Sequence, residues 1–137
     1  MWWIFALLSA FFAALTAILA KVGIKGIDTN LAVAIRTSVI LFLTWGIAFF
    51  SGGIRNISTV NKQNLIFLVL SGLTTGISWL FYFKALEIGK LSQVAPVDKL
   101  SIALTILLAY FILNETVDLK TLIGALLILG GTIVIIF

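Results

Sequence analysis

The chain has 137 residues, of which 62% are hydrophobic and 10% charged, and 9 basic against 5 acidic side chains give a net charge of +4. A soluble domain carries about 25% charged residues, so this chain has too few to cover its apolar surface, and we predict an integral membrane protein without a separate soluble domain. It contains no cysteine and no histidine, which excludes disulfides, the usual zinc sites and a histidine general base. We expect no cofactor, no metal site and no nucleic-acid partner, because the basic residues lie in short loops and at helix ends, where they orient membrane helices.

Five apolar segments use nearly the whole sequence, and each has the length of about 20 residues that a spanning helix needs. The first lacks the charged start of a signal peptide and is longer than its apolar region, so a membrane helix is favoured over a cleaved leader. We therefore predict an all-α integral membrane protein with five transmembrane helices in a single domain, residues 1–137. The helices are expected at about 2–20, 31–50, 64–86, 93–113 and 119–137.

The second segment contains a charged residue, Arg36, about five residues from its start at Leu31 and so roughly 7 Å deep. In one interpretation Arg36 extends to the lipid headgroups. In the other it faces a polar cavity and meets an anion or Asp98. Just before this segment, Asp28, Thr29 and Asn30 are candidate caps for the new helix.

Two glycine pairs mark faces where another helix can approach closely. Gly72 and Gly76 form a GxxxG element in the third segment, and Gly124 and Gly131 lie in the fifth. Small residues at such spacing favour close packing between membrane helices. For the third segment, a polar stripe facing a substrate is the alternative to packing.

Charged residues gather where the third segment ends and the fourth begins. Lys84 can pair with Glu87 three residues later, or extend to the headgroups. The fourth segment is expected to carry Pro96 in its first turn, where proline is tolerated; an earlier start would kink the helix there. Asp98 would complement the positive end of that helix, whereas Lys99 would not. A partner for Lys99 is therefore expected, either Glu87 or a bound ligand.

Together these residues define a candidate substrate site near one membrane face. Three bases and one acid give an excess of positive charge that suits a carboxylate or another anion, and the aromatic rings suit an apolar or cationic part. The alternative is a salt-bridge network at the interface that fixes helix register. The candidate residues are Arg36, Trp79, Tyr82, Lys84, Asp98, Lys99 and Tyr110.

The second half of the chain resembles a known transporter family. The stretches that carry the resemblance are Trp79 to Gly89, Val94-Ala95-Pro96-Val97-Asp98-Lys99-Leu100-Ser101, Leu113-Asn114-Glu115 and Leu122 to Gly131. They are similar to the EamA family of the drug/metabolite transporter superfamily. The resemblance implies a secondary transporter of small metabolites, such as amino acids or other carboxylate-bearing solutes. It also implies two five-helix repeats per transporter, whereas this chain supplies one, so a homodimer or a paired five-helix subunit is expected.

Charge placement gives a weak orientation signal. The loops carry three basic residues on each side, and adding the helix-end residues Arg36, Lys84 and Lys99 makes the count six against three. Insertion in both orientations and an antiparallel dimer in the inner cell membrane therefore fit the sequence. The first segment has no acid, which argues against the cation exchange of the small multidrug exporters in this superfamily. A non-transport subunit that assists a lipid carrier or another membrane complex is the alternative function, and an enzyme is not expected.

Overall fold

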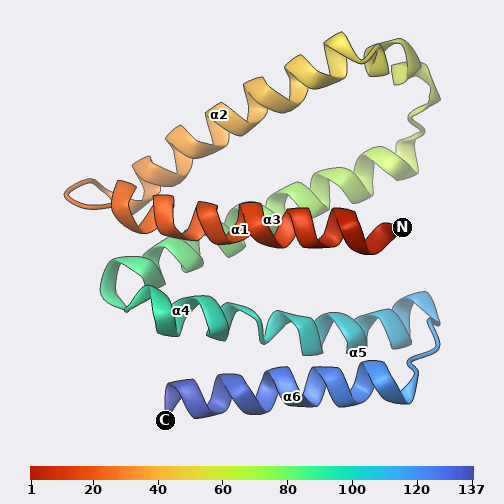
Figure 1. Cartoon of the computed structure of the whole chain (residues 1–137). Helices are drawn as coiled ribbons and strands as arrows, with labels where there is room; N and C mark the ends of the chain where they lie inside the picture. Colours follow the sequence, from red (N-terminus) through yellow and green to blue (C-terminus); the bar gives the residue numbers. More distant parts are fainter. The chain divides into compact units, whose positions relative to one another are not determined.

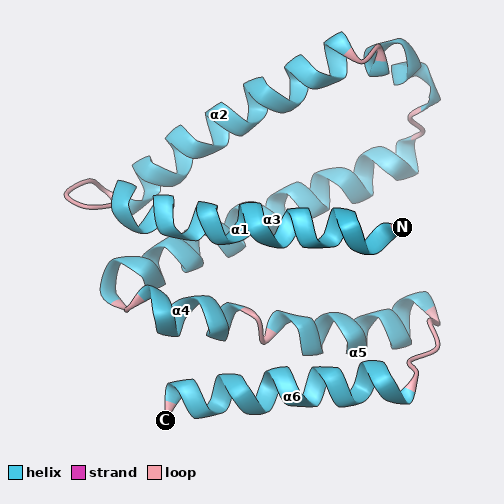
Figure 2. Cartoon of the chain, in the orientation of Figure 1, coloured by secondary structure: helices cyan, strands magenta, loops and turns pink.

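The computed structural model describes all 137 residues, and these form α-helices and one short 3-10 helix, without strands (Figure 2). The spans predicted from the sequence are present: five stretches are long and apolar enough to cross a membrane, with α4 and α5 together making the fourth. The prediction of an all-α membrane protein with five transmembrane helices is therefore confirmed. The elements are α1 (Trp2–Gly23), α2 (Thr29–Phe50), η1 (Gly53–Thr59), α3 (Lys62–Ile88), α4 (Leu91–Asp98), α5 (Ser101–Leu113) and α6 (Leu119–Ile136).

The chain divides into two compact units, whose elements can be followed along the colour bar of Figure 1. We name the stretch Leu19–Glu87 the central unit; it holds the end of α1, then α2, η1 and nearly all of α3. We name Met1–Ile18 together with Ile88–Phe137 the terminal unit; it holds most of α1 and all of α4, α5 and α6. Each unit is described by itself below.

In the central unit, the starting end of α2 meets the finishing end of α3. Asp28 caps α2 as predicted, because its Oδ1 accepts the Leu31 backbone N–H at 3.0 Å. Thr29 in the first turn of α2 is buried, and so are Phe83 and Leu86 near the end of α3. This small buried patch is the core of the unit, and it fixes which helix faces carry the candidate site.

In the terminal unit, α6 packs against α4 and α5 (Figure 1). Ala125 and Thr132, seven residues apart on one face of α6, are buried. Asp118 caps α6 by accepting the Thr121 N–H at 3.0 Å. Asn114, in the left-handed region at φ 53°, ends α5. The short polar loop between the last two spans therefore closes one helix and starts the next.

The fourth span is not the continuous helix 93–113 that the sequence predicts. Helix α4 begins at Leu91, so Pro96 lies beyond the first turn, where its missing N–H leaves a gap in the helical hydrogen bonds. After Pro96 the turns tighten: Lys99 N bonds to Pro96 O and Leu100 N to Val97 O, both at 3.0 Å. Such i to i−3 bonds are those of a 3-10 turn. The helix consequently ends at Asp98 and resumes at Ser101 (Figure 2).

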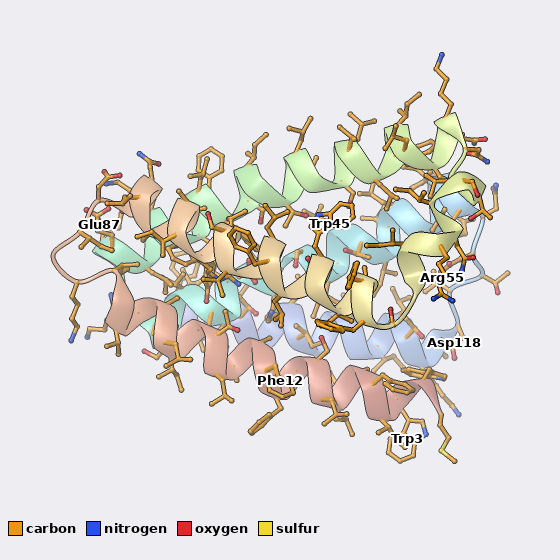
Figure 3. All side chains as sticks on the ribbon, turned by 90° about the horizontal axis from the view of Figure 1, so that it is seen from above. Trp3, Phe12, Trp45, Arg55, Glu87 and Asp118 are labelled. Carbon is orange, nitrogen blue, oxygen red and sulfur yellow. The ribbon has the colours of Figure 1, made fainter.

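Large apolar side chains cover the outside of the helices. Figure 3 shows Trp3, Phe12 and Trp45 projecting from the ribbon, and they are 53%, 62% and 54% exposed. In water such a surface would be unfavourable. In a bilayer the lipid tails are as apolar as these side chains, so the same exposure is expected of membrane helices.

Candidate substrate site

The charged residue inside α2 lies deeper than its sequence position indicates. Helix α2 begins at Thr29, two residues before the predicted start, so Arg36 lies seven residues in, or about 10 Å along the axis. Arg36 also follows the buried Thr29 and Val33 on the same face of the helix. It therefore belongs to the face of α2 that packs within the central unit, and it is half-buried.

Two aromatic rings of α3 hold the Arg36 guanidinium. Its central carbon lies 4.0 Å from the centroid of the Trp79 ring and 5.6 Å from that of Phe83. Trp79 and Phe83 are four residues apart and so share one face of α3. A cation–π contact of this kind is worth about 0.5–2 kcal/mol, depending on how far it is removed from water. The contact holds Arg36 against the neighbouring helix, which favours a polar site over extension to the headgroups.

Arg36 has no acidic partner in the central unit, since the one salt bridge there joins Lys84 and Glu87. A guanidinium stacked by its face still presents its N–H edge, and that planar fork matches the two oxygens of a carboxylate. Arg36, stacked on these two rings, can therefore bind an anionic group, and Trp79, which is half-buried, can contact an apolar one.

A second polar cluster closes the end of the central unit where α2 begins. Glu87 Oε2 accepts the Thr29 hydroxyl at 2.6 Å and the Lys84 ammonium at 2.7 Å. Lys21, in the last turn of α1, donates to the Leu86 carbonyl oxygen. Figure 3 shows Glu87 at this end and Arg55 at the opposite end of the unit. The predicted Lys84–Glu87 pair is confirmed, and it joins α3 to α2 through Thr29.

Three members of these clusters were not predicted. Thr29 was noted only as a cap, and its partner Glu87 is 58 residues away, so no local pattern could join them. Lys21 lies just beyond the predicted helix 2–20, whereas α1 extends to Gly23 and contains it. Phe83 could have been predicted from the sequence, because it follows Trp79 by one helical turn and so lies on the same face of the helix. Tyr82, a predicted site residue, is half-buried with its ring 6.4 Å from that of Phe83.

Asp98 and Lys99 lie in the terminal unit, at the break between α4 and α5. Their side chains pair at 3.4 Å and are 40% and 54% exposed. The expectation that they begin a helix is wrong, because α4 ends at Asp98 and Lys99 caps its carboxyl end. At that end a cation is favourable and an acid is not, the reverse of the predicted arrangement. Lys99 therefore needs no further partner to explain its position.

Tyr110, the last predicted site residue, is not near that pair along the chain. It lies nine residues into α5, about 14 Å from the start of the helix. Its ring meets that of Phe111 edge-on at 5.2 Å, and it is 55% exposed. The seven candidates thus separate into Arg36, Trp79, Tyr82 and Lys84 in the central unit, and Asp98, Lys99 and Tyr110 in the terminal unit.

The four predicted packing glycines have open space beside them. A Cβ placed on Gly72 or Gly76 meets no atom of the central unit within 4 Å, and the same holds for Gly124 and Gly131 in the terminal unit. Within the terminal unit, the side of α6 that does pack carries Thr132, whose hydroxyl donates to Pro96 O at 3.3 Å. Close packing at the glycines remains a prediction, for helices outside each unit.

Comparison with known proteins agrees with this architecture. The chain is a multi-pass membrane protein of the transporter class, and it belongs to the EamA-like transporter family, whose model matches residues 1–137. It is 42% identical over 134 residues to an uncharacterized transporter in the cobO 3' region of a Sinorhizobium species, covering 98% of this chain and 95% of that protein. It is also 32% identical over 81 residues to an uncharacterized protein of Methanocaldococcus jannaschii, covering 59% of each. No solved structure matches the chain. The family points to a transporter rather than an enzyme.

Proposed function

We propose that the protein is a secondary transporter of small carboxylate-bearing solutes, amino acids among them, in the inner cell membrane. The observation that carries the proposal is Arg36, a cation about 10 Å inside a membrane helix that rests on Trp79 and has no acidic partner in its unit. Charged residues at such depth are costly and mark solute pathways. Two features of one substrate are thereby matched: its carboxylate by Arg36, and its apolar or cationic part by the Trp79 ring.

We further propose that two copies form the working transporter. The resemblance to ten-helix proteins implies two repeats, and this chain provides five spans. The Sinorhizobium relative has a similar length, since the matched 134 residues are 95% of it. The open faces of Gly72 and Gly76 offer a place for a helix of the second copy.

The experiment that tests the transport proposal uses the purified full chain in lipid vesicles. Vesicles preloaded with one unlabelled amino acid take up its labelled form by exchange, and a panel of amino acids and other carboxylic acids is compared with the matching amides. Uptake of at least one carboxylate, with none of its amide, is expected. No exchange of any carboxylate, together with copurification of an unrelated membrane protein, would favour a helper subunit instead.

The orientation of the two copies in the membrane can be tested separately. Reporters fused to the carboxyl end, one active inside the cell and one active outside, report how the chain inserts. Signal from both reporters supports insertion in two orientations and an antiparallel pair. Signal from only one reporter contradicts an antiparallel homodimer and leaves a parallel pair or a second five-helix subunit.

A further inference from the structure

An open pocket lies on the central unit beside the Arg36 site, at the same end of the helices as Glu87. Its volume is about 440 Å³. The first turn of α2 and one side of α3 enclose it, and it does not include Arg36 or Trp79. The lining residues are Asp28, Thr29, Asn30, Ile77, Leu80, Phe81, Lys84 and Glu87.

The α3 side of this pocket changes from apolar to charged along one helical face. Ile77, Leu80 and Phe81 form the apolar wall, and they are 55%, 40% and 74% exposed. Lys84 and Glu87 continue the same face to the end of the helix, at spacings of three and four residues. From Ile77 to Phe81 the apolar wall is about 6 Å long, and Glu87 lies about 9 Å further along the helix axis. The pocket therefore suits a lipid whose first acyl carbons lie on the apolar wall and whose headgroup lies at the charged end.

At the charged end of the pocket, both hydrogen-bond donors and hydrogen-bond acceptors remain available to a ligand. Both bonds to Glu87 reach Oε2, which leaves Oε1 as an acceptor. Asp28 uses Oδ1 for the cap of α2, which leaves Oδ2. Lys84 has three N–H donors and gives one to Glu87. Two acceptors and two donors remain, with two acids against one base.

From this arrangement we propose that the pocket binds phosphatidylethanolamine. Its primary ammonium donates to Asp28 and Glu87, its phosphate accepts from Lys84, and one acyl chain lies along Ile77, Leu80 and Phe81. Phosphatidylcholine has the same phosphate but no N–H donor, so it cannot satisfy the two carboxylate oxygens. Phosphatidylglycerol carries net negative charge into a site with two acids. The lipid site is distinct from the Arg36 site, because the residues that line the pocket include neither Arg36 nor Trp79.

The absence of cysteine makes a direct test possible. A fluorophore on the single cysteine of Phe81→Cys reports quenching by lipids with brominated acyl chains, in vesicles of the full chain. The matched control is Phe67→Cys, on the same helix, 63% exposed and outside the pocket. Brominated phosphatidylethanolamine should quench position 81 about threefold more strongly than brominated phosphatidylcholine, with a ratio of about one at position 67. Equal quenching by the two lipids at position 81, or the same preference at both positions, would overturn the proposal.

The charges are tested in the Phe81→Cys background. Asp28→Asn keeps an oxygen for the cap of α2 but replaces the free carboxylate oxygen with an amide NH2, so it should lower the ratio towards one. Asp118→Asn makes the same change at the cap of α6, outside the pocket, and should leave the ratio at about threefold. Asp28 is exposed, so its replacement should not prevent folding. Lys84→Gln removes a phosphate contact that both lipids share, so it should weaken quenching of position 81 by both. A ratio unchanged by Asp28→Asn contradicts the headgroup assignment. An excess of soluble phosphoethanolamine should not change the ratio; if it abolishes the preference, the pocket binds the free headgroup compound and the lipid proposal is wrong.

Discussion

The two regions that carry the predicted charged residues hold them in different ways. In the central unit, Arg36 is half-buried on two aromatic rings, and no salt bridge engages it there. In the terminal unit, Asp98 and Lys99 are neighbours in sequence, exposed, and paired with each other at a helix break. A paired and exposed charge is explained by its local helix end, whereas a half-buried cation without an acid indicates a missing partner. The comparison therefore favours Arg36, rather than Lys99, as the residue that binds the proposed substrate carboxylate.

The largest effect is expected from removing that cation. Arg36→Ala should lower affinity for the transported carboxylate about 10- to 100-fold, since hydrogen bonds to charged groups are worth about 1.5–3 kcal/mol. Arg36→Lys keeps the charge but loses the planar fork, and it should recover only part of the affinity. Exchange measured over a range of substrate concentrations gives these values. Unchanged exchange in Arg36→Ala, with the protein still folded, would remove Arg36 from the site.

The next effect is expected from the ring beneath the guanidinium. Trp79→Ala should weaken the same affinity about 3- to 30-fold, because the cation–π contact contributes about 0.5–2 kcal/mol to positioning Arg36. Trp79→Phe retains a ring and should lose less. Phe67→Ala, on the same helix but in neither proposed site, is the control. Equal losses in Trp79→Ala and Phe67→Ala would mean that side-chain bulk, rather than the cation–π contact, matters.

A smaller effect on substrate affinity is expected from the Asp98–Lys99 pair in the terminal unit. Asp98→Asn and Lys99→Gln should each change substrate affinity less than about fivefold, because an exposed salt bridge contributes only about 0–1 kcal/mol. The sequence alone includes both residues in the candidate substrate site, near the start of an apolar helix. If either variant loses as much affinity as Arg36→Ala, the contrast between the two regions is wrong and both bind substrate.

The smallest effect concerns pH and the cap of α6. Hydrogen bonds from the side chain and the backbone N–H of Thr121 lower the pKa of Asp118 below its ordinary 3.8. A lowered folded-state pKa adds stability above the unfolded-state pKa, and that stability is lost as pH falls through the folded-state value. Asp118→Asn keeps a capping side chain but cannot titrate. Thermal unfolding in detergent from about pH 6 to about pH 3 should show a small wild-type advantage that vanishes at the acid end. A difference independent of pH would exclude this linkage.

The fold was predictable because hydropathy alone defines five spans, and because Asp28 and Asp118 are local caps that a short sequence pattern reveals. The interruption of the fourth span was not, since it depends on where α4 begins, and a shift of two residues moves Pro96 out of the tolerated first turn. Of the candidate site, the Lys84–Glu87 pair follows from helical spacing. The contacts of Arg36 with Trp79 and of Thr29 with Glu87 join residues 43 and 58 positions apart, and only the folded chain brings them together.

Trp79 offers the most direct test of the central claim, that Arg36 binds the substrate carboxylate. Its ring contacts the Arg36 guanidinium, so its fluorescence should report binding there. The chain has four tryptophans, at positions 2, 3, 45 and 79. Replacing the other three with phenylalanine leaves Trp79 as the only indole, and the fluorescence of this protein is titrated with a transported carboxylate and with its amide. We predict a saturable change with the carboxylate, none with the amide, and none with either in Arg36→Gln. The same saturable change in Arg36→Gln, or an equal response to the amide, would contradict carboxylate binding at Arg36.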